Sequence, residues 1–147
     1  MAPSNTTNVS VNLVGGMLFV ATAERSRGTV VLDSDPGHGG VGGGMMPMEA
    51  LLASLGSCTA MDAISILRKK RQRVTGMQVQ VHGQRAEEYP RRYTHITLEF
   101  VVRGIGVDPA AVQRSIELSQ TKYCGATASL NAEITYTFRV EEEGEDA

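Results

Sequence analysis

The chain has 147 residues, 41% of them hydrophobic, and carries a formal net charge of −2. This length and apolar content predict one folded domain over residues 1–147. The small negative charge excludes a general attraction to nucleic acid or to anionic membranes, so neither is expected as a partner. Residues 1–8 lack the features of a secretory signal and no run of about 18 apolar residues indicates a transmembrane helix, so we expect a cytoplasmic protein.

Alternation of apolar and polar residues predicts three strands near the N-terminus, at residues 9–13, 17–23 and 29–32. Gly15-Gly16 and the polar turn at 24–28 separate them, which indicates a meander. A glycine-rich loop follows at residues 34–46. Because no Gly-Lys-Ser/Thr follows the glycines, we interpret this loop as a linker or lid and not as a phosphate-binding loop.

A long apolar helix is predicted from Met48 to about Arg71, with Pro47 suited to its first turn. The basic residues that close it, 68–71, complement the negative end of the helix dipole. The helix is apolar around much of its circumference. We therefore expect it to be buried between sheets or against a second subunit, with a kink near Gly56.

The remaining chain predicts two strands around residues 77–82 and 96–102, a second helix, and a last strand at 134–140. Asp108 and Pro109 are suited to the N-cap and first position of the second helix. Its inner face is marked by Val112, Ile116 and Ser119. The element order is βββ-α-ββ-α-β, which predicts an α+β fold with mostly antiparallel sheets around a central buried helix. We expect residues 1–8 and 141–147 to be flexible.

The chain has two cysteines, Cys58 and Cys124. A buried cysteine often acts only as a small hydrophobic residue. The alternative is a nucleophile with a resolving partner, and without a secretory signal a disulfide is more typical of a transient, catalytic bond. A thiol in apolar surroundings needs a nearby cation to ionise near neutral pH, and Arg25 and Arg27 in the predicted hairpin turn are the candidates. Glu49 either orients this arginine or only favours the helix dipole.

Two further observations bear on the chemistry of the site. Asp62 follows Cys58 by one helical turn, where a carboxylate raises the pKa of a thiol; we leave its role unassigned. The sequence contains no CxxC or HExxH motif, and its histidines, His38, His82 and His95, are scattered. We therefore predict no metal site and no cofactor.

The segment PMEALLASLGSCTAMD at residues 47–62, the second cysteine segment Lys122-Tyr123-Cys124 and the element order resemble the OsmC/Ohr family. These are the osmotically inducible and organic-hydroperoxide-resistance proteins. The resemblance implies an intertwined homodimer with two sites at the subunit interface. It also implies that Cys58 is the peroxidatic thiolate, Cys124 the resolving thiol, Arg27 the activating cation with Arg25 as the alternative, and Glu49 its carboxylate partner.

Two positions place the chain in an OsmC-like branch of that family. In the hydroperoxide reductases the glutamate stands one residue further from the cysteine, where this chain has Met48, and a proline is usual where it has Gly125. The resemblance implies a thiol-dependent peroxidase that reduces organic hydroperoxides in oxidative-stress defence, with a dithiol reductant of the lipoyl type. The alternatives are a non-catalytic dimer that binds a small apolar ligand and a redox sensor.

Overall fold

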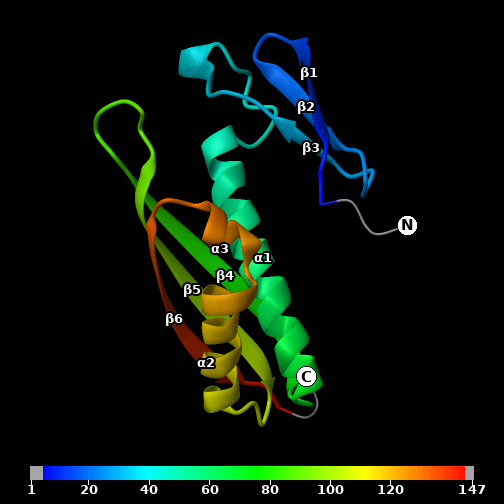
Figure 1. Ribbon diagram of the computed structural model, residues 1–147, viewed down its shortest axis with the longest axis vertical. Coiled ribbons are helices and arrows are strands. Elements are labelled where there is room, and N and C mark those ends of the chain that lie inside the picture. The colour runs from blue at the N-terminus through cyan, green and yellow to red at the C-terminus, as the bar shows by residue number, and fades with distance from the viewer. Residues whose placement is uncertain (1–4, 145–147) are drawn as a thin grey trace. The chain divides into compact units, whose positions relative to one another are not determined.

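A computed structural model describes residues 5–144 (Figure 1). The chain forms two compact units, Met1–Leu51 and Leu52–Ala147, and each is considered by itself. Each unit contains a three-stranded sheet, and the long helix begins in the last residues of the first unit. The predicted α+β class and the order of its main elements are confirmed.

The first unit is the predicted meander. Its antiparallel sheet has the order β1 (Val9–Gly15), β2 (Leu18–Ala23) and β3 (Thr29–Leu32). Every residue of β1 is exposed, including apolar side chains that a strand usually buries; Val11 keeps 56% of its surface accessible. Within its own unit the sheet therefore leaves apolar side chains exposed.

Asp33 organises the glycine-rich loop that follows β3. The side chain is buried, and its carboxylate accepts hydrogen bonds from the backbone N–H groups of Ser34 at 2.8 Å, Val41 at 3.1 Å and Gly43 at 2.9 Å. These donors, Gly43 foremost, hold the pKa of Asp33 below its ordinary value. The loop also contains a short 3-10 turn, η1 (Pro36–His38). The three hydrogen bonds to Asp33 thus hold the loop in a defined conformation. The sequence had indicated a linker or lid and had not predicted this role of Asp33.

The second unit places three helices with a mixed sheet of order β4-β5-β6. β4 (Arg73–Arg85) and β5 (Tyr93–Ile105) are antiparallel, whereas β6 (Glu133–Glu142) lies parallel to β5. A parallel neighbour requires a crossover connection. Here that connection carries α2 (Pro109–Leu118), a π-helical turn η2 (Ser119–Tyr123) and α3 (Gly125–Ser129).

The core of this unit forms where α1 (Pro47–Lys69) and α2 lie over one face of the sheet (Figure 1). Alternate side chains of β5 point into it, as the predicted period of two requires. α2 contributes Val112 and Ile116 of the predicted inner face, whereas Ser119, also buried, is the first residue of η2. The Asp108 N-cap of α2 accepts the N–H of Ala110 at 3.0 Å. Among residues 5–144 the fully buried hydrophobic residues are Leu55, Ala63, Leu67, Ile96, Leu98, Phe100, Val102, Val112 and Ile116.

Within the single chain α1 buries one face, and Met61 on another face is 68% exposed. Cover from a second subunit remains a prediction. By length and composition α1 is also apolar enough to span a membrane, contrary to the expectation that no such segment exists. The core helix of a soluble protein passes the same test, and α1 contributes Leu55, Ala63 and Leu67 to the core.

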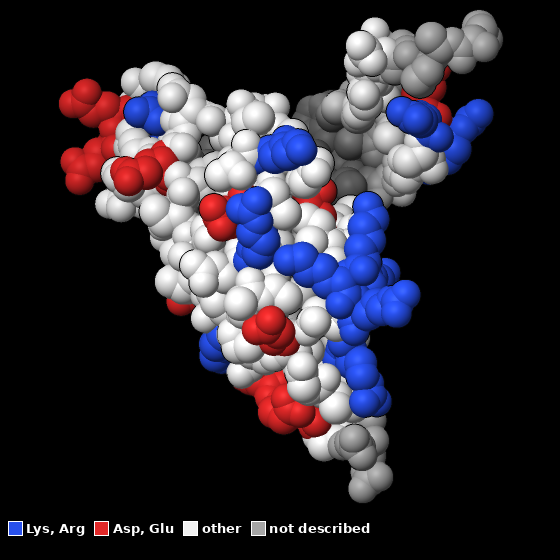
Figure 2. All heavy atoms as spheres, turned by 60° about the horizontal axis from the view of Figure 1, so that its bottom comes forward, with Lys and Arg blue, Asp and Glu red and all other residues white. Residues whose placement is uncertain are grey.

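Basic residues gather where α1 ends. Arg68 and Lys69 lie in its last turn, followed by Lys70, Arg71 and Arg73, all exposed. Figure 2 shows Lys and Arg side chains grouped on part of the surface, with acidic groups elsewhere on the same face. The placement agrees with the predicted role of these cations beside the helix C-terminus.

The last strand is longer than predicted. β6 continues through Glu141 and Glu142, so these two residues are not part of a flexible tail. The reason is electrostatic: Glu141 is paired in register with Arg103 and accepts hydrogen bonds from Arg103 at 2.9 Å and Arg139 at 3.2 Å. Residues 5–8 and 143–144 belong to no helix or strand, although Asn8 donates to Glu24 at 2.9 Å and the N–H of Glu143 donates to the carbonyl of Gly104 at 2.8 Å. The remaining parts of the predicted flexible ends, 1–4 and 145–147, lie outside the described residues.

Gly56 marks a close approach of α1 to β4. A Cβ atom at this position would lie 2.7 Å from Val81 Cγ2, so the glycine lets the helix pack on the sheet. Glycine inside a helix ordinarily costs about 1 kcal/mol relative to alanine, whereas overpacking costs about 1–3 kcal/mol. For alanine in place of Gly56, the cost of the steric contact with Val81 therefore exceeds the gain in helix propensity.

We expect Gly56→Ala to lower the free energy of unfolding by about 1 kcal/mol, measured by urea denaturation. In a Val81→Ala background the same substitution should be neutral or stabilising, because the obstructing methyl group is gone. Ser57→Ala on the exposed side of the same turn is the matched control and should change little. A rise in the urea midpoint for Gly56→Ala alone would contradict the close-packing explanation.

Candidate functional site: a facing pair of thiols

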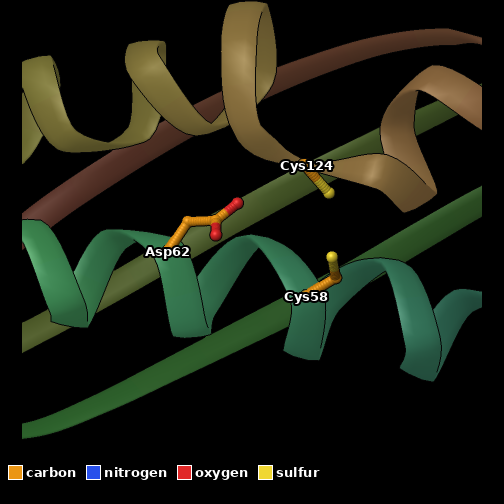
Figure 3. A group of neighbouring side chains, drawn as sticks. All are labelled: Cys58, Asp62 and Cys124. Atoms are coloured by element: carbon orange, nitrogen blue, oxygen red, sulfur yellow. The ribbon is translucent and has the colours of Figure 1, made fainter. Parts of the chain in front are cut away.

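The two cysteines meet in the second unit. Cys58 lies in the middle of α1 and is half-buried, whereas Cys124 precedes α3 and is buried, with 4% of its surface accessible. Their sulfur atoms, together with a carboxylate oxygen of Asp62, all lie within 4.8 Å of one another. In Figure 3 the two thiols point toward each other from facing segments. The predicted pairing of cysteines distant in sequence is thus present in the fold.

Local backbone geometry places Cys124. The chain leaves η2 with the N–H of Cys124 bonded to the carbonyl of Ser119 at 2.8 Å, and Cys124 then adopts an extended conformation as the N-cap of α3. Its Sγ accepts the backbone N–H of Thr127 at 3.3 Å. Gly125, at the first position of α3, has open space around it and could be replaced by the proline usual in hydroperoxide reductases. The space around this position therefore does not explain why the chain has glycine here.

A short polar network supports the sulfur of Cys124. Gln120 donates from Nε2 to Thr59 Oγ1 at 2.9 Å, which leaves the Thr59 hydroxyl proton to point at Cys124 Sγ, 3.4 Å away. Thr127 Oγ1 in turn donates to Gln120 Oε1 at 3.2 Å. Donors aimed at a sulfur stabilise its thiolate form.

The two thiols have opposite pKa shifts. Burial alone would raise the pKa of Cys124, but hydrogen bonds from Thr127, Thr59 and Cys58 outweigh it and hold that pKa below its ordinary value. The backbone N–H of Ala126 favours the Cys58 thiolate, yet burial, Cys124 and Asp62 together raise the pKa of Cys58. In the reduced pair the first proton therefore leaves Cys124, while Cys58 keeps its own. The sequence had assigned the thiolate to Cys58, given a nearby cation.

Asp62, left without a role by the sequence, belongs to this cluster. It lies one turn after Cys58 on α1, half-buried, and its Oδ2 accepts a hydrogen bond from Ser119 Oγ at 2.9 Å. The i, i+4 spacing from Cys58 was the one signal available in the sequence. The hydrogen bond of Asp62 with Ser119 and that of Thr59 with Cys124 both require η2 to pack against α1. No local sequence pattern predicts this packing.

The other predicted site residues lie in the first unit, and their roles toward Cys58 stay predictions. Arg25 and Arg27 are exposed in the turn between β2 and β3, with Arg27 in the left-handed region at φ 61°. Glu49 lies in the first turn of α1, where its Oε1 accepts the N–H of Met46 at 3.0 Å. Glu49 thus caps the start of α1 by a hydrogen bond, in addition to the favourable position in the helix dipole that the sequence offered as the alternative to a role toward the arginine.

Comparison with known proteins agrees with this fold. A family model described as OsmC-like protein matches residues 37–139. The match covers more than half of the chain, and the chain belongs to the OsmC/Ohr family. Protein YhfA of Escherichia coli (strain K12) is 42% identical over 95 residues, which are 65% of this chain and 71% of YhfA. Its name states no activity.

Solved structures extend the likeness to nearly the whole chain. A hypothetical protein from Aquifex aeolicus VF5 superposes with a TM-score of 0.77 at 29% identity, over 95% of this chain and 100% of that one. An organic hydroperoxide resistance protein from Elizabethkingia anophelis superposes with a TM-score of 0.67 at 15% identity, over 96% and 100%. The second likeness is one of fold alone.

We expect Asp62→Asn to shift the alkylation of Cys58 to lower pH. The carboxylate charge is one of the causes that raise the pKa of Cys58, so its removal lowers that pKa and forms thiolate earlier. The measurement is the rate of Cys58 alkylation against pH, followed by mass spectrometry. Glu117→Gln, which removes an exposed carboxylate paired with Arg114, is the matched control. An Asp62→Asn profile identical to the unmodified protein would remove Asp62 as a cause.

Proposed function

We propose that this protein is a thiol-dependent peroxidase that reduces organic hydroperoxides with Cys58 and Cys124. The observation that carries the proposal is the facing pair of thiols, of which one is partly exposed and the other buried. A peroxide must reach the attacking sulfur, and that requirement favours Cys58. A resolving thiol needs only to reach the first sulfur, and that favours Cys124.

The proposed reaction has two steps, reduction of the peroxide and formation of the disulfide. The Cys58 thiolate attacks one peroxide oxygen and breaks the O–O bond, so that Cys58 becomes a sulfenic acid and the alkoxide leaves as the alcohol after it takes a proton from solvent. The thiol of Cys124 then displaces the hydroxyl group as water, and the two sulfurs form a disulfide. A dithiol, of the lipoyl type by family resemblance, restores both thiols by exchange and is itself oxidised to a disulfide.

The position of the shared proton between the two thiols is compatible with these reaction steps. Before reaction Cys58 shares its proton with the more acidic Cys124. Transfer of that proton to Cys124 produces the Cys58 thiolate and leaves Cys124 protonated, ready to supply the proton of the departing water. A cation beside Cys58 lowers the cost of this transfer, and Arg27 remains our candidate for it, with Arg25 as the alternative.

The first test is chemical. One equivalent of an alkyl hydroperoxide should remove both thiols of the reduced protein and yield one equivalent of alcohol. Cys58→Ser should abolish peroxide consumption, whereas Cys124→Ser should allow one turnover and then further oxidation of Cys58 to sulfinic acid. Ser129→Ala, an exposed hydroxyl of α3, is the control. Full activity in Cys58→Ser, or two free thiols after peroxide, would refute the proposal and leave a ligand-binding or sensing role.

We also propose that the active form is an intertwined homodimer. Exposed apolar side chains occur in each unit: Val11 and Leu13 on β1, Val30 on β3, and Met61 on α1. A three-stranded sheet needs an apolar face covered to be stable, and large exposed apolar patches mark interfaces. In such a dimer Arg27 of one subunit would act on Cys58 of the other.

Refolding a mixture of two inactive variants tests the shared site. Arg27→Ala and Cys58→Ser should each be inactive alone. Random reassembly of equal amounts should restore about a quarter of the normal activity, because half of the dimers are mixed and each contains one intact site. No recovery would place the arginine and the thiol in one subunit. An active Arg27→Ala homodimer would remove this arginine from the mechanism, and a folded, active monomer in sedimentation at low micromolar concentration would exclude the dimer.

A further inference from the structure

Asp62 has no role in the proposed peroxidase reaction. Its carboxylate lies within 4.8 Å of both sulfurs, where its charge opposes the ionisation of Cys58. It is also held in place, since Ser119 donates to Oδ2 at 2.9 Å. An oriented, half-buried carboxylate beside two thiols requires a separate explanation.

The negative charge of the cluster formed by Cys58, Asp62 and Cys124 favours the binding of a cation there. With both thiols ionised, Cys58, Asp62 and Cys124 bring three negative charges together. Among residues 5–144 the hydrogen bonds and ion pairs recorded for these groups include no Lys, Arg or His side chain. A divalent cation would neutralise most of this charge, and both thiolate and carboxylate are metal ligands.

We infer that Cys58, Asp62 and Cys124 form a binding site for a single Zn²⁺ ion in the reduced protein. The ion takes two thiolate sulfurs and one carboxylate oxygen from this chain, and a water molecule fills the fourth position. Cys58 and Asp62 come from adjacent turns of one face of α1, and Cys124 comes from the facing segment that precedes α3 (Figure 3). The inference shares the thiol pair with the proposed peroxidase but does not depend on peroxidase activity.

The distances suit zinc after a small adjustment of side chains. Zn–S bonds of about 2.3 Å in tetrahedral geometry place two sulfurs about 3.8 Å apart, and Zn–O bonds of about 2.0–2.2 Å place sulfur and oxygen slightly closer. The ligand atoms, all within 4.8 Å of one another, need to close by at most about 1 Å. Asp62 supplies Oδ1, for which no hydrogen-bond partner is recorded among residues 5–144, while Ser119 holds Oδ2.

The surroundings of the cluster are those of a metal site in two further respects. Hydrogen bonds from outside the ligand set orient metal ligands, and here Thr59 and Thr127 hold the sulfur of Cys124 while Ser119 holds Asp62. Two sulfur ligands also select zinc over Mg²⁺ and Ca²⁺, which prefer oxygen. The sequence did not predict this site because its ligands are 4 and 66 positions apart and form no familiar spacing motif.

Metal binding and oxidation exclude one another at this pair. Binding replaces two thiol protons by the metal, so that each Zn²⁺ bound to the fully protonated pair releases two protons. Disulfide formation removes two electrons and converts both thiolates into one S–S bond, which no longer ligates the metal. Zn²⁺ therefore protects the reduced pair, and an oxidant releases the ion.

The test uses the full-length, reduced chain and Zn²⁺ alone. Titration against a chromophoric chelator should give one ion per chain, with proton release measured in weak buffer. Co²⁺ as a spectroscopic substitute should give a thiolate-to-metal charge-transfer band that is lost in Cys58→Ser and Cys124→Ser. Oxidation to the disulfide with diamide, which needs no peroxide, should abolish binding.

Asp62→Asn should weaken Zn²⁺ binding by at least about tenfold, while Glu117→Gln should bind as the unmodified chain does. Unchanged affinity in Asp62→Asn would overturn the assignment of Asp62. One ion per two chains, absence of the charge-transfer band, or competition by equimolar Mg²⁺ would overturn the site. If Asp62→Asn does not fold, the Co²⁺ spectra of the cysteine variants still decide the matter. Failure of the peroxide assay with normal Zn²⁺ binding, or the reverse, separates this inference from the proposed function.

Discussion

The hydrogen bonds that converge on the sulfur of Cys124 determine how the thiol pair behaves. The N–H of Thr127 and the hydroxyl of Thr59 both point at this buried atom, and Gln120 fixes the direction of the Thr59 hydroxyl. Without these donors burial would raise the pKa of Cys124, and neither thiol of the pair would ionise readily. With them the pair has one acidic member, and the proton that remains lies between the two sulfurs. The proposed redox chemistry and the proposed metal binding both begin from this state.

α1 must provide a core and a reactive group from the same apolar segment. Leu55, Ala63 and Leu67 are fully buried, while Cys58, between two of them in sequence, stays half-exposed. Gly56 permits close packing on β4, so the helix is held near the sheet without a large side chain beside the thiol. The rigid backbone of the helix then sets the spacing of Cys58 and Asp62. A loop would not hold the two groups on one face with the same precision.

Sequence patterns predicted the parts of this protein that depend on local periodicity. The meander, the alternation of β5, the Asp108 cap and the inner face of α2 all follow from the spacing of apolar residues and cap chemistry, and the structure contains them. The chemistry of the cysteines depended on tertiary placement instead. Family resemblance paired Cys58 with Cys124, but η2 and α3, which bring Thr127 and Ser119 to the site, were not anticipated. The prediction that Glu141 lies in a flexible end was wrong, because its partner in the sheet, Arg103, is 38 positions away in the sequence.

Asp62 separates the two chemistries that the thiol pair can support. A carboxylate beside Cys58 makes the nucleophile harder to ionise, so a site selected only for fast peroxide reduction has no reason to hold one. The same carboxylate supplies a third ligand for zinc and is already oriented by Ser119. In each proposal a cation neutralises the cluster: an arginine in the proposed peroxidase, and Zn²⁺ in the proposed metal site. Both can operate in one protein, because zinc holds the pair reduced until an oxidant removes it.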